Sequence, residues 1–411
     1  MLFMSNNQTS RATFLNKLGM SNSLNVIFQL TDSCVLSCKY CFAKGSHCEY
    51  GQNTLMSTDL LVQAIMQSFG THHQEVVFEW TGGEPFLAGI KLFKSVNELQ
   101  QKYANKKFYN FVQTSGYLYD KDLIDFLVEN HFHLSMTIDG PRDIHDFNRP
   151  ANGNRPSLSK ILKTRNYIVQ KQGACGAICT ITKKSIGNEA KILKYYRSLK
   201  IISFHSNPYI FFSKNLVKDK SIALTNEEYA SYFINQFNAW LEQGKKIPIP
   251  TTIDYIFHSL TAKTELANTI CAFGGRCLTN FIAIAPNGNA YICPKFIGFE
   301  TMLLGNINQA TIADILSDQS PQMSKIINER LSAINKCEKD NCQYFYLCNG
   351  GCPYYSFVNS DGENTMKKDF LCEGKKLVYK YIKNVGDALM YSNPKGLSNP
   401  PPSRKTTNFI T

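Results

Sequence analysis

The chain has 411 residues, 43% of them hydrophobic and 18% charged, which is enough for two or three domains with substantial cores. No stretch approaches the roughly 18 consecutive apolar residues of a membrane span, and the first residues lack the pattern of a cleavable signal peptide. The formal net charge is +12, but Lys and Arg are scattered, so no compact basic run indicates a nucleic-acid partner. These properties predict a cytoplasmic protein with neither a membrane nor a nucleic acid as partner.

Short β-rich segments alternate with amphipathic helical segments in the first half of the chain. Six such alternations with apolar strands predict a parallel sheet flanked by helices, in the form of a partial (β/α)6 barrel. In such sheets, chemistry gathers at the carboxyl ends of the strands. The predicted strands are Asn25–Leu30, Glu75–Trp80, Phe108–Thr114, His133–Ile138, Ala174–Ile181 and Ile201–Phe211, and the predicted helices lie near 58–69, 88–104, 120–130, 157–171 and 187–199.

The remaining segments predict an α/β protein with a second, smaller domain. Residues 1–23 lead into the barrel, which we expect to span 24–224, and 225–268 form a helical bridge. A loop-rich domain follows over 269–380, where we expect metal to replace a large core. Residues 381–411 are rich in Pro, Ser and Asn, which predicts a disordered tail.

The 14 cysteines fall mainly into two dense groups. Three lie in Cys34–Cys41, and eight lie between Cys271 and Cys372. Because nothing indicates export, disulfides are disfavoured, and the two groups indicate metal sites in two domains. The cysteines outside the groups are predicted to be buried thiols, and they are Cys48, Cys175 and Cys179.

Cys34, Cys38 and Cys41 form a C-x3-C-x2-C loop directly after the first predicted strand. Three thiolates can hold three irons of a [4Fe–4S] cube and leave the fourth iron open to a substrate-like molecule. Zinc is the main alternative, and His47 or Cys48 would then supply the fourth ligand that a tetrahedral ion requires.

A glycine-rich turn, Gly82-Gly83-Glu84-Pro85, ends the second predicted strand. Two glycines allow the backbone to approach a ligand closely, and a carboxylate can hold an ammonium group. Alone, this run also fits a strand-to-helix turn with Glu84 at the helix start. Its position one strand after the cysteine loop favours the binding of a nucleotide-like cofactor.

Together with Gln113–Gly116 and Ile138–Pro141, these motifs resemble the radical S-adenosylmethionine superfamily over residues 24–212. The resemblance implies that the three cysteines ligate a [4Fe–4S] cluster whose open iron is chelated by S-adenosylmethionine. Reductive cleavage then yields methionine and a 5′-deoxyadenosyl radical that takes a hydrogen from the substrate, with an electron donor such as flavodoxin or ferredoxin as partner. Thr137 and Ser115 stand where relatives often have Ser and Asn. The cofactor contacts that the resemblance implies are Tyr40, Gly82, Gly83, Glu84, Thr137 and Arg149.

The second cysteine group has enough thiols for two four-ligand clusters, although two zinc sites would use the same number. With Asn349–Pro353 and Leu304–Ile307, it resembles the SPASM extension of radical enzymes that modify peptides and proteins. The resemblance implies two auxiliary clusters, and hence three [4Fe–4S] clusters in all. Asp340 stands where relatives have a cysteine, so either Cys342 replaces that ligand or Asp340 is itself the ligand. The implied ligands are Cys271, Cys277, Cys293 and Cys352 for one cluster and Cys337, Cys342, Cys348 and Cys372 for the other.

The most similar named subfamily by pattern is the anaerobic sulfatase maturases, which convert a Ser or Cys to formylglycine. Those relatives carry an Asp, resembling a general base, directly after the third auxiliary cysteine, whereas this chain has Pro294 followed by Lys295. Proline cannot take a proton, and Lys is protonated unless it is strongly desolvated. We therefore expect a maturase that installs an intramolecular crosslink (cyclophane, ether or thioether) in a ribosomally made precursor peptide. Formylglycine formation and RNA modification are the alternatives.

Overall fold

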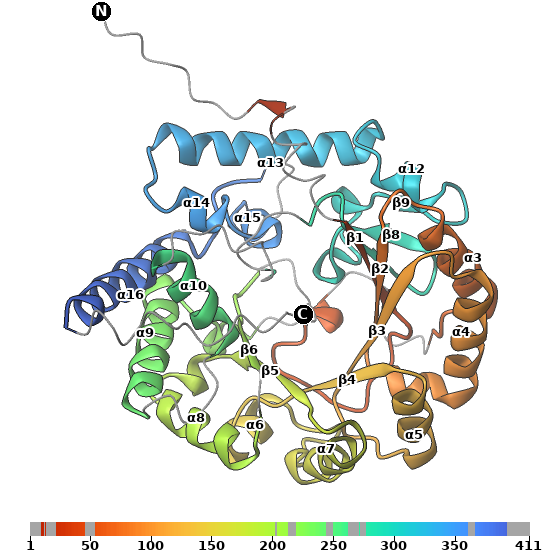
Figure 1. The fold of residues 1–411 in the computed structure, drawn as a ribbon, viewed down its shortest axis with the longest axis horizontal. Helices are drawn as coiled ribbons and strands as arrows, with labels where there is room; N and C mark the ends of the chain where they lie inside the picture. Colours follow the sequence, from red (N-terminus) through yellow and green to blue (C-terminus); the bar gives the residue numbers. More distant parts are fainter. Residues whose placement is uncertain are drawn as a thin grey trace, which may run out of the picture.

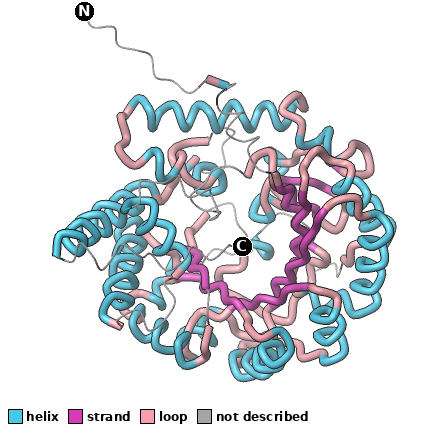
Figure 2. The backbone as a smooth tube through the Cα atoms, in the orientation of Figure 1, coloured by secondary structure: helices cyan, strands magenta, loops and turns pink. Residues whose placement is uncertain are grey.

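Six parallel strands follow one another in chain order along a curved sheet, as predicted. The computed structural model describes residues 10–11, 13, 22–45, 54–201, 204–212, 219–243, 250–261, 271, 277–360 and 366–392. In Figures 1 and 2 the strands form an inner arc and the helices an outer layer, which is an open barrel. The strands are β1 (Ser23–Gln29), β2 (Glu75–Thr81), β3 (Lys107–Thr114), β4 (Phe132–Thr137), β5 (Gly176–Ile181) and β6 (Phe204–Pro208).

The outer helices begin at side-chain caps and bury one apolar face against the sheet. Ser57 accepts a hydrogen bond from the Leu60 amide at the start of α3, and Asp120 caps α5 in the same way. On β2, the Phe78 and Trp80 rings face the helices, so the alternating residues Val77 and Glu79 face the barrel interior. These helices are α2 (Phe42–Gly45), α3 (Thr58–Phe69), α4 (Gly89–Tyr103), α5 (Lys121–Glu129), α6 (Arg142–Asn148), α7 (Leu158–Gln172) and α8 (Glu189–Ser198).

Three further strands extend the same sheet beyond β1, which the sequence did not predict. β7 (Phe281–Ile284) pairs in parallel with β1, with Asn25 opposite Phe281. β8 (Asn289–Tyr291) and β9 (Gly305–Asn306) then continue as antiparallel neighbours, so the described part of the chain has nine strands in one sheet. The second cysteine-rich region is thus joined to the barrel by backbone hydrogen bonds.

The C-terminal region contains several helices between its loops, and its core is continuous with that of the barrel. Ile326, Ile327 and Leu347 are buried in the same hydrophobic cluster as the barrel residues. None of the described helices is long and apolar enough to cross a membrane. The helices are α12 (Ile312–Leu316), α13 (Pro321–Lys339), α14 (Phe345–Cys348), α15 (Pro353–Asn359) and α16 (Cys372–Ser392).

The predicted helical bridge is present as α9 (Asn226–Glu242) and α10 (Thr251–Thr261), and α16 lies against both. Residues 381–392, predicted as part of a disordered tail, continue α16. The reason is a helical spacing of apolar side chains, including Val378 and Ile382, which are fully buried. The domain boundary at residue 269 stays a prediction, since most residues around it lie outside the described ranges.

Candidate active site

The loop with the first three cysteines leaves the carboxyl end of β1 and contacts the glycine-rich turn after β2. The Gly83 amide donates to the Thr31 carbonyl oxygen at 2.8 Å, and the Glu84 amide donates to the Ser33 carbonyl oxygen at 2.8 Å. A Cβ atom on Gly83 would lie 2.0 Å from that Ser33 oxygen. Glycine is required here because the backbone of the cysteine loop approaches so closely.

The other side of the cysteine loop contacts the segment after α6. The Ser37 amide donates to the Pro150 carbonyl oxygen at 2.7 Å, and the Lys39 amide donates to the Asn148 carbonyl oxygen at 2.9 Å. These bonds place the intervening Arg149 beside the cysteine loop. The structure thus brings together the cysteine motif and the Arg149 segment, which lie more than 100 positions apart in the sequence.

Tyr40 links Arg149 to a third buried group, Asp139. An Arg149 Nη1 atom donates to the Tyr40 hydroxyl at 2.8 Å, and this hydroxyl donates to Asp139 Oδ2 at 2.8 Å. Burial raises the pKa of Asp139 to about 6, against the lowering effect of Arg149. Asp139 was missed as a site residue, although it lies in the quoted Ile138–Pro141 motif.

The three thiols are close enough to influence one another electrostatically. Burial raises the pKa of Cys34 to about 11 and that of Cys38 to about 12, with smaller contributions from the neighbouring thiols. The Arg149 cation beside these thiols fits an anionic iron–sulfur cluster, which requires thiolates. His47 and Cys48, the alternative zinc ligands, lie outside the described residues.

The Glu84 carboxylate accepts hydrogen bonds from neighbouring groups of the protein itself. Its Oε1 accepts from the Thr114 hydroxyl at 2.6 Å, and its Oε2 accepts from the Ser115 amide at 2.9 Å. It also caps the short 3-10 helix η1 (Pro85–Ala88). A direct contact of the fully buried Glu84 carboxylate with a cofactor ammonium group stays a prediction. Thr137 accepts from Gln113 at 3.1 Å near the same strand ends.

The structure brings together four cysteines of the second group beside the barrel. Burial raises the pKa of Cys277, and the nearby thiols of Cys271 and Cys352 add to this shift. Cys293 belongs to the same electrostatic cluster. These are the four ligands that the SPASM resemblance implies for one auxiliary cluster.

Lys295 lies beside this set, at the start of the C-terminal domain. Its ammonium nitrogen is 5.3 Å from the Tyr354 ring centre and 5.1 Å from that of Tyr355. Pro294 begins the 3-10 helix η4 (Pro294–Phe296) directly after Cys293. A cation held by two rings thus follows the position where sulfatase maturases carry an Asp.

The other four cysteines line one pocket of about 290 Å³. Lys368, Lys375 and Lys376 also line it, so an anionic group there would be surrounded by positive charge. The volume, the four thiols and the cations fit a second iron–sulfur cluster. Asp340 lies in the same wall, so the choice between it and Cys342 stays open. The four cysteines are Cys337, Cys342, Cys348 and Cys372.

Outside both groups, Cys175 and Cys179 are buried thiols as predicted, whereas Cys48 lies outside the described residues. Glu79 was missed as a candidate. The residue is 2% exposed, its Oε1 has no hydrogen-bond partner among the described residues, and burial raises its pKa to about 8. The sequence did carry a signal, because Glu79 stands between the apolar residues Phe78 and Trp80 in the middle of the strand.

Comparisons with known proteins also divide the chain into a barrel region and a cysteine-rich C-terminal region. Residues 28–185 match the family described as "Radical SAM superfamily", and residues 271–343 match SPASM, described as "Iron-sulfur cluster-binding domain". The chain is 25% identical over 361 residues to the cysteine-type anaerobic sulfatase-maturating enzyme of Clostridium perfringens (strain 13 / Type A), covering 85% of this chain and 94% of the relative. It is also 25% identical over 378 residues to the serine-type enzyme of Bacteroides thetaiotaomicron, covering 86% of each.

Solved structures share the fold. The structure titled "Native anSMEcpe with bound AdoMet and Cp18Cys peptide" matches with a TM-score of 0.75 and 23% identity, covering 89% of this chain and 99% of the other. Streptococcus suis SuiB bound to S-adenosylmethionine matches with a TM-score of 0.61 and 18% identity, covering 88% and 80%. The protein therefore contains a radical S-adenosylmethionine domain followed by a SPASM iron–sulfur domain, and its homologues include anaerobic sulfatase maturases.

Proposed function

We propose that this enzyme oxidises side chains of a ribosomally made precursor peptide and installs an intramolecular crosslink. The proposal assigns a radical-generating [4Fe–4S] cluster to Cys34, Cys38 and Cys41, and two auxiliary clusters to the two later sets of four cysteines. When bound, the first cluster and S-adenosylmethionine supply a 5′-deoxyadenosyl radical that takes one hydrogen atom from the substrate. The grouping of the cysteines in the structure supports this assignment.

The protein residues around the first site would position the cofactor. The Tyr40 hydroxyl, held by Arg149 and Asp139, and the backbone of Gly82 and Gly83 lie along the cysteine loop. Their polar groups are fixed before any cofactor binds, which reduces the ordering cost of binding. Thr137, at the end of a neighbouring strand, is proposed as a further contact.

The observation that favours crosslinking is Pro294, directly after Cys293. The sulfatase maturases that the chain resembles carry a carboxylate there as proton acceptor, and proline offers no such group. A crosslink between two side chains removes two hydrogens from the peptide. One would leave as the abstracted atom, and the other would leave as a proton to water, with its electron accepted by an auxiliary cluster. An electron donor of the flavodoxin or ferredoxin type would supply the electron that cleaves S-adenosylmethionine.

Formylglycine formation is the second candidate. It is favoured by the similarity to sulfatase-maturating enzymes along 94% of the length of the Clostridium perfringens relative. Another base would then have to replace the missing Asp. Glu79 is a candidate because it is buried in the barrel interior, where no residue that the structure describes is a hydrogen-bond partner of its Oε1.

The first test compares the reconstituted, reduced protein with a variant in which Cys34, Cys38 and Cys41 are all replaced by Ala. We expect the parent to bind about twelve irons and to convert S-adenosylmethionine to 5′-deoxyadenosine, and the variant to keep about eight irons without cleavage. A parent that forms no 5′-deoxyadenosine would refute the radical function. A variant that loses all its iron would refute the separation into independent sites.

The second test distinguishes the two reactions. The enzyme is co-expressed with a short peptide encoded beside its gene, or incubated with a sulfatase-type peptide carrying a Cys or Ser target. A crosslink appears as the loss of two hydrogens with no tandem-mass fragments between the joined residues. A product that reacts with a hydrazide probe is an aldehyde, which would replace crosslinking by formylglycine formation.

A further inference from the structure

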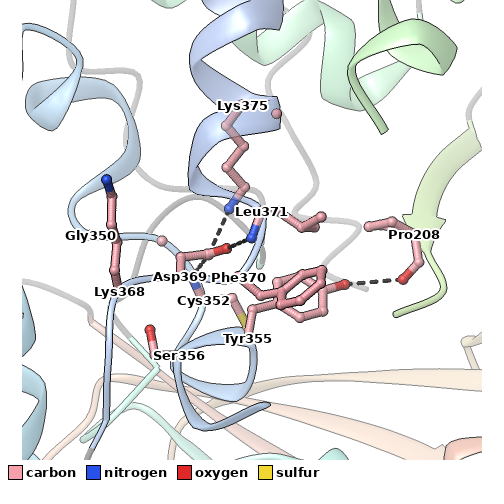
Figure 3. A network of polar contacts seen from close by, with 12 residues as sticks. Pro208, Gly350, Cys352, Tyr355, Ser356, Lys368, Asp369, Phe370, Leu371 and Lys375 are labelled. Atoms are coloured by element: carbon pink, nitrogen blue, oxygen red, sulfur yellow. Dashed lines mark hydrogen bonds and ion pairs between the residues drawn. The ribbon is translucent and has the colours of Figure 1, made fainter. Parts of the chain in front are cut away.

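A buried ion pair lies between the two sets of auxiliary cysteines. Lys375 Nζ is 2.9 Å from Asp369 Oδ2, and both side chains are at most 3% exposed. Figure 3 shows the pair beside Cys352 and Tyr355, with the lysine reaching down from α16. A buried charge pair costs desolvation energy that an apolar pair would avoid, so its position calls for an explanation.

Asp369 is bonded to one cysteine of each set. Its Oδ2 accepts from the Cys352 amide at 2.7 Å, and its backbone carbonyl oxygen accepts from the Cys372 amide at 3.0 Å. Its Oδ1 accepts from the Leu371 amide at 2.7 Å, which fixes the carboxylate in place. Cys352 belongs to the set near the barrel, and Cys372 belongs to the set that lines the pocket.

Lys375 likewise faces both sets. It lines the pocket of Cys348 and Cys372. Its charge also acts on the thiol of Cys352 in the other set, and through its partner Asp369 it is tied to the Cys352 amide. Because the pair is buried, solvent and salt screen this charge little.

We propose that the Asp369–Lys375 pair couples the two auxiliary clusters, with Lys375 as a positive charge shared by both and Asp369 as the residue that positions it. This inference rests on the proposed function, which assigns the two clusters to these cysteines. Reduction adds negative charge to a cluster, so a nearby cation favours the reduced state and a nearby carboxylate opposes it. Each of the two charges would therefore act on both clusters: Lys375 would raise both reduction potentials, and Asp369 would lower both.

The test is an EPR-monitored redox titration of the full-length holoprotein. The auxiliary signals are recorded alone in the variant that has Ala at positions 34, 38 and 41. Lys375→Met should make both clusters harder to reduce, by about tenfold or more in the reduction equilibrium, which corresponds to 59 mV for a one-electron couple. Asp369→Asn removes the carboxylate charge that opposes reduction and should make both clusters easier to reduce. Lys375→Arg keeps the charge and should keep both potentials.

Lys376→Met is the matched control. Lys376 lines the same pocket, but it is 35% exposed and bonds to Glu373 at 3.5 Å. Its loss should shift only the cluster of the pocket set, and by less, because solvent screens an exposed charge.

Opposite shifts in Lys375→Met and Asp369→Asn, seen in both clusters, would support the inference, since a purely structural role predicts no such change of sign. Unchanged potentials, or a shift in one cluster only, would overturn it. If Lys375→Met does not retain its iron, the shift in Asp369→Asn decides alone. A parent protein with fewer than two auxiliary signals would overturn the proposed function together with this inference. Two auxiliary signals whose potentials do not respond to the variants would overturn this inference alone.

Discussion

Arg149 donates a hydrogen bond of 2.8 Å to the hydroxyl of Tyr40, which lies 109 positions earlier in the chain. Tyr40 sits between the second and third cysteines of the first motif, and Arg149 follows α6. The bond therefore connects the cysteine loop to the segment after α6. The same hydroxyl donates a second hydrogen bond to Asp139.

Replacing Tyr40 by Phe removes both bonds and leaves two buried charged side chains without this partner. We expect the free energy of unfolding to fall by about 1–3 kcal/mol and the affinity for S-adenosylmethionine to drop, with the first cluster still bound. Thermal unfolding and equilibrium binding measure the two effects. Tyr119→Phe, at a tyrosine that is 41% exposed, is the control, and equal stability of both variants would contradict the role of this hydroxyl.

Gly351 is needed because the carboxylate of Asp369 occupies the space of a side chain. A Cβ atom there would lie 2.1 Å from Asp369 Oδ2, and the residue has a φ of +77°. Gly351→Ala should displace that carboxylate and lower the iron content of both auxiliary sites. Gly173→Ala is the control because Gly173 has a φ of +84° and no described residue within 4 Å of an added Cβ atom, so it should cost only about 1 kcal/mol and no iron. Equal iron loss in both variants would show that backbone strain alone is responsible.

Glu79→Gln should stabilise the protein at high pH. Burial raises the pKa of Glu79 from 4.5 to about 8, so the folded state retains a proton that the unfolded chain releases. The stability associated with this proton is complete below pH 4.5 and is lost as the pH rises through 8. The variant should match the parent near pH 4.5 and exceed it by roughly 2–4 kcal/mol above pH 8.

Unfolding midpoints of the anaerobic holoprotein across this pH range measure the effect. Glu75→Gln on the same strand is the control, since the Glu75 carboxylate is partly exposed and bonds to Lys107 at 3.2 Å. If Glu79→Gln gains no stability at high pH, the folded protein stabilises the ionised Glu79 carboxylate, which would contradict the raised pKa.

Arg330 holds the turn that precedes Cys352. Its guanidinium donates to three successive carbonyl oxygens, those of Asn349, Gly350 and Gly351, and its side chain is fully buried. Arg330→Met leaves these oxygens unpaired and should destabilise the protein by about 3–5 kcal/mol. Arg330→Lys keeps the charge, but a lysine lacks the planar set of donors of a guanidinium. Its stability should therefore lie between those of the parent and of Arg330→Met. Thermal unfolding checks the order, and a lysine variant as stable as the parent would show that charge alone suffices.

The barrel strands were predictable because each is a short apolar run followed by a helical pattern, and all six are present within a few residues of their predicted ends. The extension of the sheet by β7, β8 and β9 was not predictable in this way. These strands have two to four residues, and β7 depends on a partner, β1, that lies more than 250 positions earlier. Local patterns do not carry such long-range pairing.

The same limit applies to the site. Cysteine spacing and the Gly82–Glu84 run predicted which residues lie at the first site, because these residues have few other uses. Asp369, Lys375 and Arg330 gave no such signal, since charged residues are common and only the three-dimensional arrangement shows that these three are buried. The roles of Arg330 and Asp369 depend on hydrogen bonds to backbone groups that are distant in the sequence.

The pairing of β1 with β7 has a consequence for the chain in the cell. Until β7 is synthesised, one edge of the barrel sheet offers the unpaired backbone groups of residues 25–28, in a strand that is buried in the complete fold. Exposed apolar edges of this kind recruit strands from other molecules. A chain that stops before Cys277 should therefore associate edge to edge and aggregate, and the nascent barrel needs protection until its C-terminal region arrives.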